Sequence, residues 1–415
     1  MNFFDRILTL LILIYIVVLP IFPSKYKIDG VPLNGDVILA IIIFFYLINL
    51  IFNRGVRDRL FIRIKNLVQD FTGLSGILLL LVMVFSVTYS QNRSIAAGET
   101  IRFGTYIALY FIIKLEVKGE NIKNTLIAIM TMAVLISVIG LLGLYFGFGV
   151  EKQSSSNGIM MLRIESTLEN SNNLGAFLIL TVFPMISFTL NEKKIINKIL
   201  AGLGSIIIFA AMVSTQSRNC LLAFAFGCIC YVLIYNWKSV VFLIIAFVGM
   251  LFVPQIRNRV MQIGDVAQDQ SRIKLWKIAL KMIKDHKILG VGNGNYVTAY
   301  SKYEVEFKDV YYNTYGQFHP HNILLKVQSE LGIMGTIAFI SLMLAILKNL
   351  YNVIKYKTGK FYEHFYKGFL VSFISFMMMN LLDNFFSAPK VIAFFWILIA
   401  LAGAILNQCS LKVAT

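Results

Sequence analysis

Two histidines and an asparagine stand directly before a long apolar segment, in the order His319, Pro320, His321 and Asn322. The dipole of a helix disfavours a protonated imidazole near the helix N-terminus, so a histidine in this position can stay neutral and accept a proton. That is the role of a general base, and His321 is the predicted candidate. Another interpretation is structural, with both histidines capping a helix at the membrane interface. Farther along the segment, Gly332 and Gly335 would let a second helix approach closely.

Two arginines elsewhere in the chain could bind an anion. Arg218 lies in a short polar stretch between two apolar segments, and Arg272 opens an amphipathic pattern that continues to about residue 285. A guanidinium grips phosphate through two parallel hydrogen bonds, and backbone N–H groups at a helix start would add to the grip of Arg272. The alternative for Arg218 is a side chain that reaches from a helix end to the interface. The amphipathic pattern predicts a helix on the outer membrane surface with Trp276 as an interfacial anchor.

A polar stretch upstream contains Arg163, Glu165, Glu169 and Asn173. Such side chains suit the hydroxyl groups of a sugar, and they equally suit an ordinary solvated loop. Arg163 and Asn173 are predicted to bind substrate, together with His319, Asn322 and Trp276. Near the end of the chain, Asp383 is expected to pair with Lys390.

Several motifs are missing from the sequence or lack their context. It has no DxD pair for a metal-bound nucleotide sugar and no P-loop, and His319 and His321 lack a third metal ligand nearby. The glycine-rich run at residues 290–294 has no strand–helix context, so it indicates a tight turn rather than a nucleotide site. We therefore expect neither a metal nor another cofactor.

The composition indicates the setting of these residues. The chain has 415 residues, of which 58% are hydrophobic and 14% charged. Charged residues make up about a quarter of a soluble domain, so this is predicted to be an all-α polytopic membrane protein, residues 1–415 forming one integral membrane domain. The net charge of +17 does not call for a nucleic acid, because an excess of basic residues in cytoplasmic loops explains it.

Apolar runs predict about twelve transmembrane helices. Their approximate residues are 7–22, 37–51, 73–89, 101–115, 125–146, 174–190, 195–213, 220–235, 240–253, 323–350, 365–386 and 391–406. Lysine and arginine gather in alternate loops, which places these loops and both termini in the cytoplasm. The loops at 147–173 and 254–322 then lie outside, the second between helices 9 and 10. The predicted base and both arginines fall on this outer side.

The motif around His321 resembles that of the O-antigen ligase and polymerase superfamily, which are bacterial membrane glycosyltransferases. The likeness rests on His321-Asn322, nine intervening residues, and Gly332-Ile-Met-Gly335. It extends to Arg218, to Arg272 before a tryptophan-containing helix, to the glycine turn and to the asparagines before residue 174. It covers about residues 163–335.

The resemblance implies a GT-C-like, metal-independent, inverting glycosyltransferase in the bacterial cytoplasmic membrane. Its donor would be a glycan on undecaprenyl diphosphate, held by Arg218 and Arg272 while His321 deprotonates the acceptor hydroxyl. The large loop would carry part of the active site. A ligase passes the glycan to a lipid core or another anchor, and the motif spacing favours this type. A polymerase would extend another lipid-linked glycan, and a flippase or transporter for lipid-linked glycans is the alternative from another class.

Overall fold

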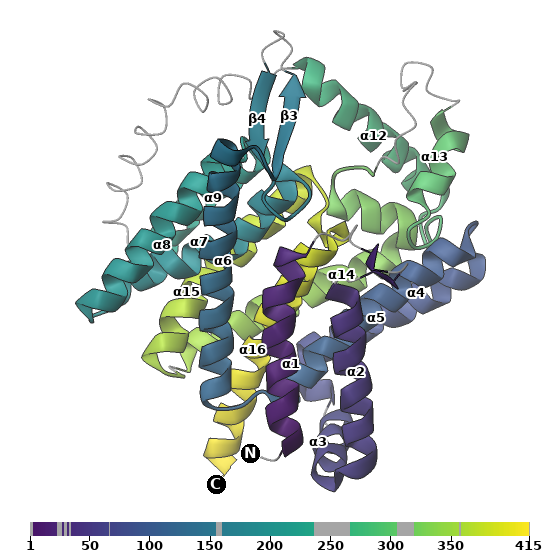
Figure 1. Cartoon of the computed structure of the whole chain (residues 1–415). Coiled ribbons are helices and arrows are strands. Elements are labelled where there is room, and N and C mark those ends of the chain that lie inside the picture. Colours follow the sequence, from purple (N-terminus) through teal and green to yellow (C-terminus); the bar gives the residue numbers. More distant parts are fainter. Residues whose placement is uncertain are drawn as a thin grey trace.

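The computed structural model describes residues 3–22, 27–28, 31–32, 35–65, 67–154, 160–235, 266–304, 319–356 and 358–414. These residues are almost entirely helical, with two short antiparallel hairpins (Figure 1). The elements in chain order are α1 (Phe3–Ile21), β1 (Lys27–Ile28), β2 (Val31–Pro32), α2 (Gly35–Phe52), α3 (Arg54–Lys65), η1 (Leu67–Gln69), α4 (Phe71–Tyr89), α5 (Arg93–Glu116), α6 (Glu120–Phe146), β3 (Val150–Ser154), β4 (Met160–Ile164), α7 (Ser171–Asn191), α8 (Ile195–Ser214), α9 (Arg218–Tyr235), α12 (Val266–Asp285), α13 (Tyr296–Glu304), α14 (Ile323–Lys355), α15 (Lys360–Leu382), η4 (Phe385–Ser387) and α16 (Pro389–Ala414).

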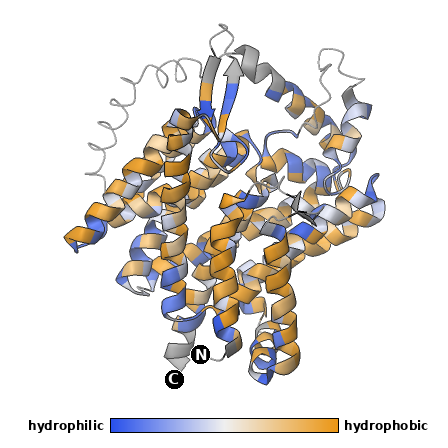
Figure 2. Cartoon of the chain, viewed as in Figure 1, coloured by the Kyte–Doolittle hydropathy of each residue, from blue (hydrophilic) through white to orange (hydrophobic). Residues whose placement is uncertain are grey.

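Among the described residues, 10 helices are long and apolar enough to cross a membrane, namely α1, α2, α4, α6, α7, α8, α9, α14, α15 and α16. Figure 2 shows the apolar character of these long helices. The predicted span at 101–115 falls in α5, which is 24 residues long but is not among the helices apolar enough to qualify. The predicted span at 240–253 lies outside the described residues. The protein is thus a polytopic helical membrane protein, as the composition predicts.

Two ion pairs lie inside the body of the molecule, among the described residues. Lys114 of α5 forms an ion pair with Asp70 and donates to the Tyr110 hydroxyl at 3.0 Å, and Glu116 pairs with Arg59 of α3. An unpaired charge at membrane depth is costly, and these pairs remove that cost. They explain why a helix as polar as α5 can pack within the bundle.

The centre of the molecule is built around α7, α15 and α16. Every residue from 391 to 405 in α16 is buried, and most of α7 is buried as well. A helix that is apolar on all sides is stable only when other helices surround it; α5, α14 and α7 pack against α16, and α15, α8 and α9 pack against α7.

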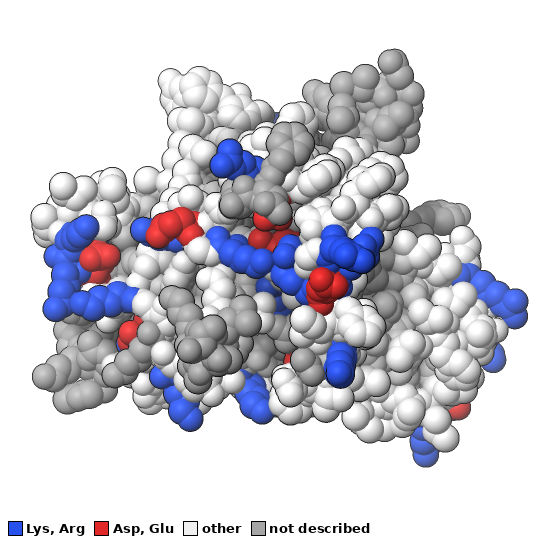
Figure 3. Space-filling model, turned by 90° about the horizontal axis from the view of Figure 1, so that it is seen from below, with Lys and Arg blue, Asp and Glu red and all other residues white. Residues whose placement is uncertain are grey.

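The two ends of the helical body differ. Both chain termini lie at the lower end in Figure 1, and Figure 3 shows lysine and arginine side chains spread across that face. The hairpin of β3 and β4 lies at the opposite end together with α12 and α13. These hairpin strands pair from Val150 with Ile164 to Ser154 with Met160, and with β1–β2 they depart from the all-α prediction.

The described part of the large loop folds onto the body. The predicted amphipathic helix exists as α12, but the prediction that its apolar face lies on the membrane is wrong. Ile278, Ala279 and Met282 are fully buried in a small core with Tyr296 and other residues of α13. Protein, rather than lipid, covers this face because α13 follows α12 after a tight turn and packs back against it.

Candidate active site

The predicted base lies in the linker that enters α14. Asn322 is the N-cap residue, and its side-chain oxygen accepts from the Leu325 N–H at 3.1 Å, as asparagine commonly does at this position. His321 comes just before the cap and holds a left-handed backbone conformation, with φ of 47°. Non-glycine residues rarely adopt this conformation, and those that do are frequent at functional sites.

The His321 ring is held by Asp383, at the end of α15. His321 Nδ1 lies 2.8 Å from Asp383 Oδ1, and a carboxylate can only accept in this hydrogen bond, so Nδ1 is the donor. This arrangement leaves Nε2 as the nitrogen that can take a proton. The expected pair of Asp383 with Lys390 is wrong. Lys390 instead pairs with Glu169 at 3.4 Å and donates to the Thr167 carbonyl at 2.7 Å.

His319 has a different environment. Its Nδ1 is buried and makes no hydrogen bond among the described residues. Burial, followed by the nearby charges of Lys326 and His321, lowers the pKa of His319 to about 4. The imidazole is therefore neutral over the whole physiological range.

The last turn of α15 joins His321 to Arg218. The Asn322 side-chain amide donates to the Leu381 carbonyl at 2.9 Å. The side-chain amide of Asn219, the residue after Arg218, donates to the Met379 carbonyl at 2.9 Å. The start of α9 and the start of α14 are thereby fixed to the same turn. The sequence pattern did not single out Asn219, and it predicted the wrong partner for Asp383.

Arg218 is the first residue of α9, in agreement with its predicted place between two apolar segments. Its charge, after burial, contributes to the lowered pKa of Arg163, so the two guanidiniums lie near each other. Arg163 is buried on β4 and donates to the Thr215 carbonyl at 2.9 Å and to Asn172 Oδ1 at 3.0 Å. These bonds fix the hairpin to the turn before α9, so Arg163 has a structural role whether or not it meets substrate.

Asn173 lies in the first turn of α7, where its backbone N–H donates to Asn170 Oδ1 at 3.3 Å. Its neighbour Asn172, rather than Asn173, contacts Arg163. Contact of Asn173 with a ligand stays a prediction.

The large loop reaches the linker through Trp276. Its indole Nε1–H donates to the Pro320 carbonyl at 2.7 Å, so this group anchors α12 to protein rather than to the membrane interface. Arg272 precedes Trp276 by four residues and therefore lies on the same side of α12. The prediction that Arg272 opens the helix is wrong, because α12 begins at Val266 and the helix-start N–H groups lie one to two turns earlier.

Residues 203–340 match a family model described as O-antigen ligase. This segment runs from α8 into α14 and contains Arg218, Arg272 and the linker with His321. The match shows that this segment is similar to the O-antigen ligase family, and it supports the resemblance to the O-antigen ligase and polymerase superfamily that the sequence motif predicted. The family indicates a multi-pass membrane protein with a glycosyltransferase-like role and lipid-linked glycans as substrates. No curated protein matches the chain.

Proposed function

We propose that the chain is a glycosyltransferase that moves a glycan from undecaprenyl diphosphate to a sugar hydroxyl of an acceptor, in the manner of an O-antigen ligase. The observation that carries the proposal is that Asn322 and Asn219, the residues after His321 and Arg218, both bond the last turn of α15, with Asp383 bonded to His321. A base with a fixed ring and a phosphate-binding cation are the two groups that such a transfer requires.

In the proposed reaction, His321 Nε2 takes the proton of the acceptor hydroxyl. The hydroxyl oxygen forms a bond to the anomeric carbon of the donor glycan while the bond from that carbon to the diphosphate oxygen breaks. Attack from the opposite face inverts the anomeric centre. Arg218 and Arg272 neutralise the charge that develops on the departing diphosphate, so no step requires a metal ion.

Other residues of the site hold this arrangement. Asp383 keeps the His321 ring in the orientation that exposes Nε2, and its charge stabilises the protonated ring after transfer. Asn322 and Trp276 fix the linker from two sides. Asn173 and His319 are the candidates for contact with the glycan.

The proposed setting is the bacterial cytoplasmic membrane. The end with α12, α13 and the β3–β4 hairpin would face the outside, and the basic end with both termini would face the cytoplasm. A polymerase would use the same residues with a second lipid-linked glycan as acceptor. A transporter would instead need unpaired charges along a central path, whereas the charges of Lys114 and Glu116 are paired.

Transfer by purified protein tests the proposal. The donor is the lipid-linked glycan that accumulates in a strain lacking the gene, and release of undecaprenyl diphosphate is measured in nanodiscs. His321→Ala should lose about 10²–10⁴-fold in rate, and His319→Ala much less. Arg218→Ala and Arg272→Ala should be inactive and lysine at either position should restore little, because an ammonium cannot replace a guanidinium fork.

Arg54→Ala is the matched control, an exposed arginine at the opposite end of the molecule. Normal turnover in Arg218→Ala or His321→Ala would contradict the mechanism. The size of the product separates the two family types, because a ladder of lipid-linked repeats identifies a polymerase. Movement of the glycan across a vesicle membrane without release of undecaprenyl diphosphate would identify a transporter.

A further inference from the structure

The backbone of α14 is broken at Gly332, which has φ of 61° and ψ of −160°. A break frees N–H and carbonyl groups that a continuous helix would pair, and buried groups of this kind need other partners. Here the loop after α12 supplies them. The Ile333 N–H donates to the Lys287 carbonyl at 3.0 Å, and the carbonyls of Ser329 and Glu330 each accept at 2.8 Å, from Val291 and Gly292.

Glycines allow the two backbones to meet. A Cβ on Gly332 would overlap the carbonyl oxygen of Ile288, and a Cβ on Gly290 would overlap the carbonyl of Glu330. Both glycines also have positive φ, which other residues rarely adopt. The glycine-rich run of the sequence is therefore the loop side of a contact with α14, and Gly332 is the helix side.

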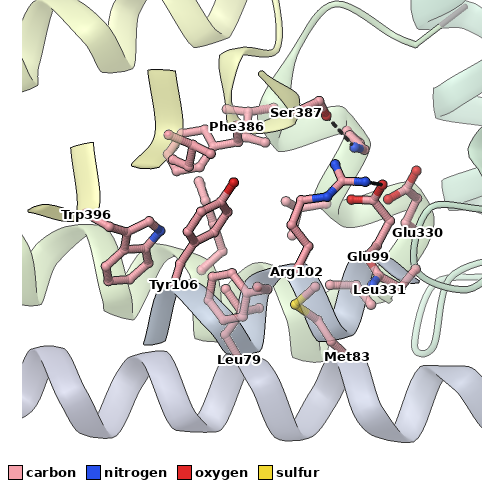
Figure 4. Close-up of a pocket in the computed structure, with 17 residues that line it drawn as sticks. Leu79, Met83, Glu99, Arg102, Tyr106, Glu330, Leu331, Phe386, Ser387 and Trp396 are labelled. Carbon is pink, nitrogen blue, oxygen red and sulfur yellow. Dashed lines mark hydrogen bonds and ion pairs between the residues drawn. The ribbon is translucent and has the colours of Figure 1, made fainter. Parts of the chain in front are cut away.

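The Glu330 side chain completes this contact. One carboxylate oxygen accepts from the Gly294 N–H at 3.0 Å and the other from the N–H of Tyr296, the first residue of α13, at 3.4 Å. The residue is only 3% exposed, and Figure 4 shows it in the wall of a cavity that also contains Glu99 and Arg102. A buried carboxylate is costly unless it is hydrogen-bonded, and a helix N-terminus favours a negative charge.

The segment between α12 and α13, residues 289–296, forms a turn that is also bound to the junction of α4 and α5. The Asn295 side-chain amide donates to the Asn92 carbonyl at 3.1 Å, and its oxygen accepts from the Asn92 N–H at 2.7 Å. Asn293 lies nearby and donates to Thr100 Oγ1 at 3.2 Å. The turn thus joins α14 to the N-terminal half of the bundle.

Movement of this turn would displace α12. The turn connects α12 to α13, and the Tyr296 hydroxyl donates to the Leu275 carbonyl of α12 at 2.8 Å. Arg272 and Trp276 are carried on α12, and Trp276 is bonded to the linker of His321. The separation between Arg272 and His321 therefore depends on how the turn is attached to α14.

We propose that Glu330 is a positioning residue for the transfer reaction: its carboxylate locks residues 289–296 onto α14 and so fixes Arg272 relative to His321. This inference rests on the proposed function for its effect on catalysis, but the lock itself is a structural property. Glu330 acts through α12 and has no contact with the donor in this proposal.

The test compares two isosteric substitutions of glutamates that line one cavity. Glu330→Gln replaces one acceptor oxygen by an amide donor that faces a backbone N–H, and it weakens the lock. Glu99→Gln is the matched control, because Glu99 pairs with Arg102 at 3.0 Å and accepts no hydrogen bond from the turn in the described contacts. Spin labels at Lys277→Cys on α12 and Ile337→Cys on α14, both exposed positions, report the separation in nanodiscs after the 4 native cysteines are replaced by alanine.

Glu330→Gln should broaden the distance distribution and raise KM for the lipid-linked donor several-fold with a smaller change in kcat, while Glu99→Gln leaves both unchanged. If Glu330→Gln does not fold, Gly290→Ala, which forces the turn away from the Glu330 carbonyl, should give the same broadening. An unchanged distribution in a folded Glu330→Gln or Gly290→Ala protein, or equal broadening in Glu99→Gln, overturns the lock. The spin-label result does not depend on chemistry, so a failure of the proposed reaction would be seen separately in the His321 and Arg218 variants.

Discussion

At the scale of residues, one hydrogen bond decides how His321 can act. His321 and Asp383 are 62 residues apart in the sequence, and their ring nitrogen and carboxylate oxygen are 2.8 Å apart in the structure. The histidine is 36% exposed at its side chain and Asp383 only 17%, so a substrate can reach the ring while the carboxylate supports it from within. This arrangement supports the proposed role of His321 as a base that Asp383 orients.

Asp383→Asn tests whether the Asp383 carboxylate orients the His321 ring. Asparagine keeps the size of the side chain but lacks the negative charge, so the protonated ring loses its stabilisation and the wrong ring nitrogen can be presented. We expect kcat for glycan transfer to fall by at least tenfold, but by less than the roughly 10²–10⁴-fold loss of a missing base. Single-turnover rates with saturating donor measure this. Lys390→Met is the control, because Lys390 bonds Glu169 and Thr167 rather than Asp383, and equal losses in both variants would contradict the role of Asp383.

His319 should control acid stability rather than the pH dependence of the rate. Its pKa is lowered from 6.5 to about 4, so the unfolded chain binds a proton more readily than the folded one between these values. Stability is then lost as the pH falls below about 6.5, and this loss should be smaller in His319→Gln. Melting temperatures of the purified proteins at pH 7 and pH 4.5 test this. A parallel decline in the parent and His319→Gln would show that the buried neutral imidazole is unimportant.

At the scale of elements, α14 is two helical segments with separate tasks. The first segment carries the Asn322 cap and Glu330, and the second spans the membrane region and packs against α4. The break lets the first segment present its backbone carbonyls to the large loop, which an unbroken helix could not do. The prediction that Gly332 lets a second helix approach closely is wrong, because the backbone that lies against Gly332 is that of Ile288 in the loop after α12.

Gly332→Ala should destabilise the protein strongly. Alanine is strained at φ of 61°, and its Cβ would overlap the Ile288 carbonyl, so we expect a cost of about 1–3 kcal/mol or more. Gly98→Ala in α5 is the matched control, because a Cβ there meets nothing within 4 Å and alanine favours a helix. Thermal unfolding in detergent compares the two. A melting temperature that is equally lowered, or lowered more, in Gly98→Ala would contradict the steric argument.

At the scale of the whole molecule, the proposed active-site residues and the basic face lie at opposite ends. The linker of His321, the start of α9 and the α12–α13 unit gather at one end, and both termini lie at the other, where basic side chains are spread across the face (Figures 1 and 3). Basic loops are retained in the cytoplasm during membrane insertion. The arrangement therefore favours a site that meets substrates outside the cytoplasm.

Cysteine labelling tests this orientation. Lys302→Cys on α13 and Asp58→Cys on α3 are exposed positions at the two ends. In spheroplasts, a membrane-impermeant maleimide should modify Lys302→Cys, and Asp58→Cys only after permeabilisation. The reverse pattern would place the proposed active site in the cytoplasm and exclude the donor assigned to it.

Much of the fold could be predicted because its signals are local. Long apolar runs predict ten helices that the structure contains, since burial of backbone groups in a bilayer requires helices. The Asn322 cap, the amphipathic pattern of α12 and the glycine turn are likewise encoded by neighbouring residues. The His321 motif, with Arg218 and the other features that resemble the family, also predicted the similarity to O-antigen ligases that the family model finds over residues 203–340.

Partners that are distant in the sequence were decided by the tertiary structure alone. Asp383 had a histidine and a lysine available, and it bonds His321 because Lys390 extends toward Glu169 and Thr167. The apolar face of α12 could have faced lipid equally well, but α13 covers it. Glu330 gives no local signal of its role, since its partners, the N–H groups of Gly294 and Tyr296, lie in another part of the chain. Local periodicity determines which helices form, whereas the pairing of single polar groups depends on which helix ends the packed bundle brings together.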